Sequence, residues 1–180
     1  AAGPLYHIRR VAVEWPEGSA GLATNPAFVP ALMTGAAARA EAIVGAETAL
    51  VHQVMNCGYP AGRAAPRTVV VDHAARAVDV TYRLIRGEPG RMGEAVITGL
   101  KTVRAGALVR KQTFQAGDPF AADLLDAYRD RLVDSGLFTL VDVRMATQTD
   151  AEGRLPVQVD VTERRHRTVR LGAEYHSDEG

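Results

Sequence analysis

One arrangement of strands and helices occurs twice in the chain, and this repeat limits the folds that are open to it. An amphipathic stretch ends at Gly58, and a second one ends at Gly136. Each stretch follows a strand-like run and a shorter helical segment, and two more extended runs come after it. The repeated unit is therefore β-α-α-β-β. We expect an α+β fold in which the two helices of each unit cover one face of a three-stranded sheet.

The long helices are marked by their ends and by apolar spacing. We expect Asp118 to cap the first turn of the second long helix, with Pro119 at its first helical position. Gly58 and Gly136 suit the left-handed conformation just beyond a helix end. Apolar residues recur at helical spacing in both helices, as Ala46, Leu50, Val54 and Met55 and as Leu124, Leu125, Tyr128, Leu132 and Val133.

The extended runs that follow each long helix are expected to form hairpins. They cover residues 67–71 and 77–84 in the first unit and residues 139–145 and 155–162 in the second, with turn-type residues between them. Val157, Val159 and Val161 alternate with polar residues, which predicts a strand with one buried face. The strands that open the units are expected at residues 6–15 and 92–98, and the shorter helices at residues 107–112 and somewhere in residues 27–33.

The two units are separated by a short polar segment at residues 87–90, Gly-Glu-Pro-Gly. We therefore place the first domain at residues 1–87 and the second at residues 88–165, with residues 166–180 beyond both. Because the connection is so short, we expect a restricted hinge between the domains, not free tumbling.

Composition excludes several classes of function. The chain has 21 basic and 21 acidic residues, and a net charge of zero argues against nucleic acid as the main partner. No run approaches the ~20 apolar residues of a membrane-spanning helix. Cys57 is the only cysteine, so an internal disulfide and a thiolate zinc cage are both excluded. We expect no cofactor and no metal site, and the common phosphate-, dinucleotide- and zinc-binding motifs are absent.

Two residue pairs could suggest catalysis. Cys57 and His52 are five residues apart on one helix, which aligns them poorly, and the dipole at a helix C-terminus disfavours a thiolate. His73 stands beside Asp72, where a hairpin turn is expected. Both pairs are better explained by packing and turn formation, so we predict no catalytic residues and no enzymatic activity.

The repeated unit resembles a POTRA domain, the periplasmic module that precedes the barrel in outer-membrane proteins of the Omp85 superfamily. Residues 135–138, Ser-Gly-Leu-Phe, resemble the end of the second POTRA helix, and residues 159–164 resemble the last POTRA strand. The resemblance implies two tandem POTRA domains, each with a three-stranded mixed sheet. Within the superfamily it is closest to the TamA branch (translocation and assembly module), through residues 6–8, 58–60, 69–73, 78–82 and 93–99 in the same order.

The end of the chain resembles the first barrel strand of such proteins. Residues 171–180 read Leu-Gly-Ala-Glu-Tyr-His-Ser-Asp-Glu-Gly. The resemblance implies that residues 166–180 are a linker and the start of the barrel. The chain would then be the periplasmic portion of an outer-membrane protein, cut just inside a barrel that continues beyond Gly180.

The resemblance also implies what the chain binds. A TamA-like arm would dock a TamB-like periplasmic protein anchored in the inner membrane and guide unfolded outer-membrane or autotransporter clients, by adding their strands to an open sheet edge. The edge residues carried over are Thr68, Val69, Val70 and Val71 in the first domain and Val141, Asp142, Val143 and Arg144 in the second. The alternative is that neighbouring segments shield these edges or that the domains serve only as rigid spacers.

The cluster Arg164, Arg165, Arg167 and Arg170 is expected either to form part of a solvated linker or to lie near the outer-membrane surface. Two alternatives to a TamA-like arm remain open. One is the arm of another Omp85 transporter, of the two-partner secretion or fused-passenger type, and the other is a periplasmic scaffold without a barrel.

Overall fold

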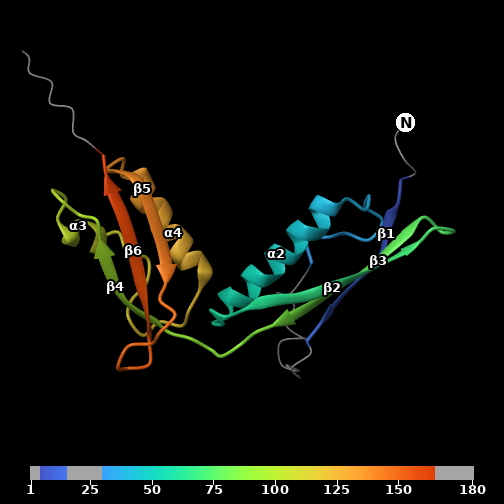
Figure 1. The fold of residues 1–180 in the computed structure, drawn as a ribbon, viewed down its shortest axis with the longest axis horizontal. Helices are drawn as coiled ribbons and strands as arrows, with labels where there is room; N and C mark the ends of the chain where they lie inside the picture. The colour runs from blue at the N-terminus through green and yellow to red at the C-terminus, as the bar shows by residue number, and fades with distance from the viewer. Residues whose placement is uncertain (1–4, 16–29, 165–180) are drawn as a thin grey trace, which may run out of the picture.

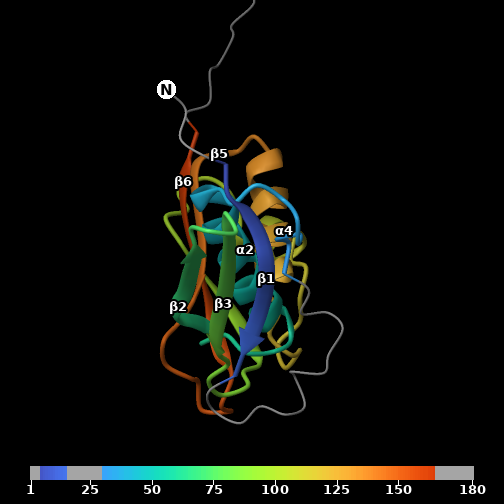
Figure 2. The same ribbon diagram turned by 90° about the vertical axis from the view of Figure 1, so that its right-hand side faces the viewer.

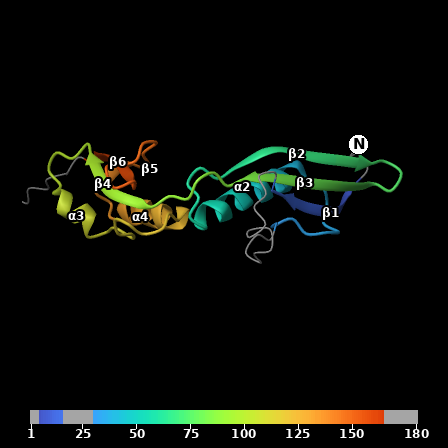
Figure 3. The same cartoon turned by 90° about the horizontal axis from the view of Figure 1, so that it is seen from below.

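The computed structural model describes residues 5–15 and 30–164, which form two three-stranded mixed sheets. Figure 1 shows the two sheets in opposite halves of the molecule, and Figure 3 shows that the molecule is elongated. Each half has its own cluster of buried apolar side chains. The expected α+β fold with two mixed sheets is confirmed.

The first unit contains β1 (His7–Glu14), α2 (Ala40–Asn56), β2 (Arg63–Asp72) and β3 (Ala77–Ile85). The strand order is β1-β3-β2, with β1 parallel and β2 antiparallel to the central strand β3. Figure 2 shows the three strands side by side with α2 behind them. The expected hairpin is present as β2 and β3, and β2 begins four residues before the expected residue 67.

The second unit repeats this arrangement. It contains β4 (Met92–Thr98), α3 (Ala105–Val109), α4 (Ala122–Asp134), β5 (Phe138–Met145) and β6 (Leu155–Glu163). The strand order is β4-β6-β5, with β4 parallel and β5 antiparallel to the central strand β6. In both units, therefore, the chain leaves the sheet through the central strand.

The central strands supply the core because alternate side chains point to the helical face. On β6, Val157 and Val159 are fully buried and Val161 is 5% exposed, as their alternation predicted. On β3 the buried set is Val78, Val80, Tyr82 and Leu84. Two buried tyrosine hydroxyls donate to helix carbonyls: that of Tyr82 to Ile43, at 2.9 Å, and that of Tyr128 to Leu108, at 3.2 Å. Neither buried hydroxyl is therefore left without a partner.

The long helices end as expected. Gly58 follows α2 with a φ of 98°, and Gly136 follows α4 with a φ of 67°, both in the left-handed region that glycine adopts without strain. Within residues 5–15 and 30–164, no helix combines the length and apolar character needed to cross a membrane.

The expected start of α4 is wrong. The helix begins at Ala122, and its N-cap position is held by Ala121. Asp118 and Pro119 belong instead to the preceding segment, where the carbonyl of Asp118 accepts from Met92 at 2.8 Å and Pro119 bridges Arg91. The carboxylate of Asp118 accepts from the backbone of Gln115 at 2.8 Å and thus caps a turn. Pairing with the start of β4 overrides the local helix signal.

The short helices are less well predicted. α3 spans Ala105–Val109, so it lies two to three residues before the expected position at 107–112. Of the expected segment at 27–33, residues 27–29 lie outside the described residues, and residues 30–33 are not helical.

Candidate functional site

The edge of the first sheet at β2 is the most exposed apolar edge in the described part of the chain. β2 pairs only with β3 there, so its other side is open. Val69, Val70 and Val71 are 42%, 54% and 44% exposed. The expected edge residues Thr68 to Val71 therefore do lie on an edge strand. An exposed edge of this kind carries unpaired N–H and C=O groups and can accept another strand.

The register shows how the three valines are directed. Val69 and Val71 pair with Val80 and Val78, which are buried beneath α2, so both point to the helical side. Val70 pairs with Asp79 and points to the open face. The β2 edge is therefore apolar on both faces, and none of the residues 68–71 is charged.

The regular part of this edge begins at Thr68 for a physical reason. The register between β2 and β3 shifts between Ala65 and Thr68, and Pro66 lies within that shift. Proline has no N–H to donate to a ladder, so it is tolerated at such an irregularity. Beyond it, Arg67 forms an ion pair with Glu47 of α2 at 2.5 Å, which ties this end of β2 to the helix.

The edge of the second sheet at β5 has the same position but a different chemistry. Val141, Asp142, Val143 and Arg144 all lie on β5, again at an edge. The Arg144 guanidinium contacts Asp160 of β6 at 2.6 Å and also pairs with Asp142. Its Nε donates to Gln158 at 3.1 Å. Charged side chains on an edge discourage strand addition, so β5 is the poorer acceptor of the two.

A similar charged cluster lies on the open face of the first sheet and reaches the end of the edge strand β2 at Asp72. Arg9 is the extra residue where the register of β1 shifts, and its guanidinium contacts Asp79 at 2.6 Å and Asp72 at 2.9 Å. Hydrogen bonds from Arg9 lower the pKa of Asp79, and the backbone of Ala75 followed by Arg9 lowers that of Asp72. Both carboxylates are therefore held ionised, and the cluster lies on the same face as Val70, whose cross-strand partner is Asp79.

The opposite edges of the two sheets are partly covered by the chain itself. At the start of β1, the backbone of Ile8 donates to Ala36 at 2.8 Å and accepts from Gly35 at 2.7 Å. At the start of β4, Met92 donates to Asp118 at 2.8 Å and accepts from Gly117 at 2.7 Å. In both units the segment before the long helix thus pairs with the first strand, whereas β2 and β5 have no such cover among the described residues.

Of the expected basic cluster, the structure describes Arg164 alone. Its side chain is exposed, and its backbone donates to Leu137 at 2.8 Å. Arg165, Arg167 and Arg170 lie outside the described residues, as does the expected barrel strand at 171–180.

The last residue of β6 is fixed by a ring of donors. The Glu163 carboxylate accepts from the hydroxyl of Thr102 at 2.5 Å and from the backbones of Lys101, Thr102 and Val103 at 2.7 to 3.0 Å. The Thr102 hydroxyl, followed by the backbones of Lys101 and Val103, lowers the pKa of Glu163 from 4.5 to about 2. This carboxylate joins the end of the second sheet to the loop before α3.

We expect this contact to make the second unit sensitive to acid. Because the pKa of Glu163 is lower in the folded chain, its contribution to stability is complete above pH 5 and is lost as the pH falls towards 2. Glu163→Gln should therefore lower the melting temperature of the second unit at pH 6, and the difference from the wild type should vanish near pH 2. The control is Glu94→Gln, at an exposed position of β4. An equal difference at both pH values would contradict the assignment.

The joint between the units was missed by the sequence reasoning. The side-chain Oδ1 of Asn56, at the end of α2, accepts from the backbone N–H of Asp123 in α4 at 2.9 Å. His52 Nε2 lies 3.2 Å from Asp126 Oδ2. No sequence signal indicated this contact, because Asp118 offered a local cap and the N-cap position at Ala121 is known only from the structure.

Backbone and apolar contacts complete the joint. The N–H of Gly90 donates to the carbonyl of Gly58 at 2.9 Å, and Met55 packs against the second core. A Cβ at Gly90 would lie 2.6 Å from Pro60, so only glycine fits this approach. The linker is thus held against the end of α2, in agreement with a restricted hinge.

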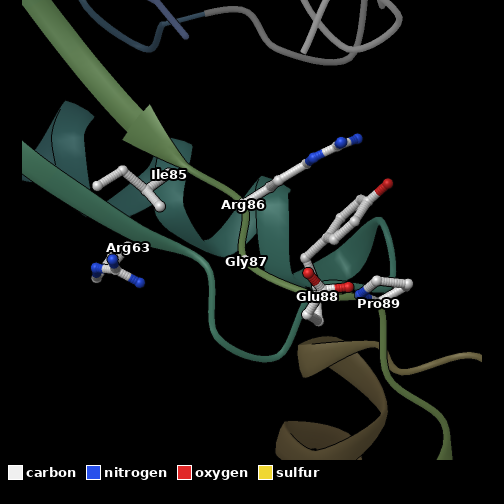
Figure 4. Close-up of a pocket in the computed structure, with 7 residues that line it drawn as sticks. Arg63, Ile85, Arg86, Gly87, Glu88 and Pro89 are labelled. Carbon is white, nitrogen blue, oxygen red and sulfur yellow. The ribbon is translucent and has the colours of Figure 1, made fainter. Parts of the chain in front are cut away.

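A cavity of about 420 Å³ opens beside this linker, lined by Tyr59, Arg63, Ile85, Arg86, Gly87, Glu88 and Pro89. The Arg86 guanidinium lies 5.6 Å from the centre of the Tyr59 ring. Figure 4 shows Arg63 and Arg86 extending in different directions from the two sides of the strand end at Ile85. The two guanidinium groups do not converge on one ligand position.

The residue pairs that could have suggested catalysis have other contacts. His52 is directed at Asp126, and Cys57 is an exposed free thiol at the C-cap of α2. His73 lies in the turn between β2 and β3, with its Nδ1 2.8 Å from the hydroxyl of Tyr6. Within residues 5–15 and 30–164, no three His, Cys, Asp or Glu side chains are placed to hold a metal ion.

The chain matches no protein-family model and no curated protein sequence. Its structure is similar to POTRA domains 3–5 of BamA from Haemophilus influenzae, with a TM-score of 0.73 and 19% identity over 88% of this chain and 61% of that one. It is also similar to BamA from Haemophilus ducreyi lacking POTRA domains 1–3, with a TM-score of 0.70 and 14% identity over 88% of this chain and 30% of that one.

These likenesses show the fold. The two units have the architecture of tandem POTRA domains, as the sequence resemblance implied. The chain spans less than two thirds of either BamA chain.

Proposed function

We propose that the chain is the periplasmic arm of an Omp85-superfamily outer-membrane protein. Its domains would be residues 1–87 and 88–165, with residues 166–180 leading into a barrel. The fold shared with BamA POTRA domains supports this proposal, together with the POTRA-like residues 135–138 and 159–164. The arm would act by binding and guiding, not by catalysis.

The β2 edge carries the functional part of this proposal. Three consecutive exposed valines lie on β2, a strand that has no described neighbour on one side. An incoming strand would pair with the backbone of residues 68–71 and lay apolar side chains over Val69 and Val71 on the helical side. Backbone pairing gives affinity with little selectivity for sequence, which suits a surface that receives many clients. The charged β5 edge is the less favoured site.

The finer assignment is to a TamA-like arm. Its partner would be a TamB-like periplasmic protein anchored in the inner membrane, and its clients unfolded outer-membrane proteins or autotransporters. The arginines at 164, 165, 167 and 170 would lie near the outer-membrane surface. The sequence segments in TamA-like order support this branch.

The edge can be tested with a synthetic peptide that has the alternating apolar and polar pattern of an outer-membrane strand. Val69→Pro should weaken peptide binding about tenfold, because the backbone N–H of Val69 faces the open side of β2 and proline replaces it with a ring where a partner strand would lie. Val70→Lys keeps the backbone intact and should also weaken binding, since an edge lysine resists pairing. Affinity is measured by titration calorimetry, and circular dichroism verifies the fold.

The matched control lies on the other sheet. Leu140 of β5 is 59% exposed, so Leu140→Lys makes the same change at the competing edge. Binding should survive this change. A loss with Leu140→Lys and not with Val70→Lys would move the site to β5, and unchanged binding in every folded variant would remove strand addition at both edges.

The membrane context needs a separate measurement. An antibody against this chain, used on membranes of the source cell, should detect a much larger product in the outer-membrane fraction that migrates differently when left unboiled. That result would support the barrel and leave the choice of Omp85 branch to partner capture. A soluble product near 20 kDa would favour the scaffold without a barrel.

A further inference from the structure

The second long helix is capped by a side chain from the first unit. Ala121 occupies the N-cap position of α4, and alanine has no side-chain acceptor. The Asn56 Oδ1 at the end of α2 fills this role by accepting from the N–H of Asp123. A cap satisfies a backbone donor that would otherwise need water, and losing it costs about 1 kcal/mol. Formation of this helix end is therefore coupled to docking of the two units.

A histidine lies beside this cap and faces two carboxylates. His52 Nε2 is 3.2 Å from Asp126 Oδ2, and His52 Nδ1 is 3.7 Å from Asp123 Oδ1. On its own helix, His52 Nδ1 is 3.4 Å from Asn56 Nδ2. The other oxygen of Asp126 is 3.0 Å from the guanidinium of Arg129. These groups face His52 from α2 and from α4.

The two protonation states of His52 make different contacts. A neutral ring that donates from Nε2 to Asp126 presents Nδ1 as an acceptor, which suits the Asn56 amide. A protonated ring donates from both nitrogens: it gives up the contact with the Asn56 amide and attracts Asp123 as well as Asp126. The carbonyl end of α2 favours a positive charge at His52 and the N-terminal end of α4 opposes it, so the two carboxylates of α4 decide the balance.

We propose that this joint is a proton-responsive clasp, in which protonation of His52 tightens the docking of α2 against α4. The arm is then stiffer at mildly acidic pH than at neutral pH. Histidine is the side chain that ordinarily changes charge in this range. Among the described residues, the joint is otherwise held by the Asn56–Asp123 hydrogen bond, the Gly90–Gly58 backbone bond and the packing of Met55, so a change at His52 alters a sizeable share of it. The inference does not depend on the proposed function.

The test uses the whole chain and measures how the two units tumble. Backbone ¹⁵N relaxation gives a rotational correlation time for each unit. At pH 5.5 the correlation times of the two units should agree, as in one rigid body. At pH 7.5 both correlation times should fall, because the fraction of molecules with an open joint rises about two- to fivefold. In His52→Gln, which retains hydrogen bonding and cannot become charged, the values should be independent of pH. Asp126→Asn should reduce the response.

The control is His73→Gln, which removes another histidine, in the hairpin turn of the first unit. This variant should keep the full pH response. Equal tumbling of the wild type at both pH values would overturn the proposal, and so would a response that persists in His52→Gln. His52 is 40% exposed, so its substitution should leave both folds intact, as the dispersion of the spectra will show.

Discussion

Replacing Gly99 with alanine should destabilise the second unit by about 3–5 kcal/mol, enough to unfold much of it. Gly99 follows β4 directly and has a φ of 84°, a conformation that residues with a Cβ rarely adopt. A Cβ there would also overlap the backbone carbonyl of Val161 on β6. Because β6 is paired with a strand on each side, the carbonyl of Val161 can move away only if hydrogen bonds between β4 and β6 break.

Gly117→Ala is the matched control for this prediction. Gly117 has a φ of 96°, but a Cβ there would meet nothing within 4 Å. Gly117→Ala should therefore lower the free energy of unfolding only through the strained backbone conformation, by about 1–2 kcal/mol. Urea unfolding measured by NMR follows each unit separately, while the fluorescence of Trp15, the only tryptophan in the chain, reports on the first. Equal costs for the two variants would show that the strand ladder adapts to the added methyl group.

Truncating one core leucine should destabilise its own unit by about 2–5 kcal/mol and leave the other nearly unchanged. Leu50 of α2 and Leu132 of α4 are both fully buried, and they belong to separate cores. Leu50→Ala should therefore lower the unfolding midpoint of the first unit, and Leu132→Ala that of the second.

Each of these variants is the control for the other. Residue-resolved unfolding would show two transitions that move independently. A small shared shift is expected through the cap of Asn56 on α4, because undocking removes that hydrogen bond. If either variant shifted both transitions by the full amount, the two cores would have to be treated as one cooperative unit.

Much of the fold was predictable because its signals are local. The alternation of Val157, Val159 and Val161 indicates a half-buried strand, and glycine after an amphipathic stretch indicates a helix end. The start of α4 was not predictable in this way. Asp118 and Pro119 form a good local start signal, yet the backbone of Asp118 pairs with Met92, 26 positions earlier in the chain. Local preference gave way to a contact between distant residues.

The candidate site, too, could be predicted from the sequence only in part. The edge positions of β2 and β5 follow from the strand order that the family resemblance implied. The contrast between the two edges depends on register, because Arg144 meets Asp160 and Gln158 only once β5 is aligned with β6. The roles of His52 and Asn56 need the placement of one unit against the other, and no spacing within either helix shows it.

The way in which the chain enters and leaves each sheet determines how the arm bears a mechanical load. It enters by the edge strand β1 or β4 and leaves by the central strand β3 or β6, which runs parallel to the first. Tension on the two ends of a unit therefore pulls parallel neighbours in opposite directions along their length. All the hydrogen bonds between them are then strained together in shear, whereas a peeled edge strand would release them one at a time. Both units are built to transmit a pull along the chain without opening.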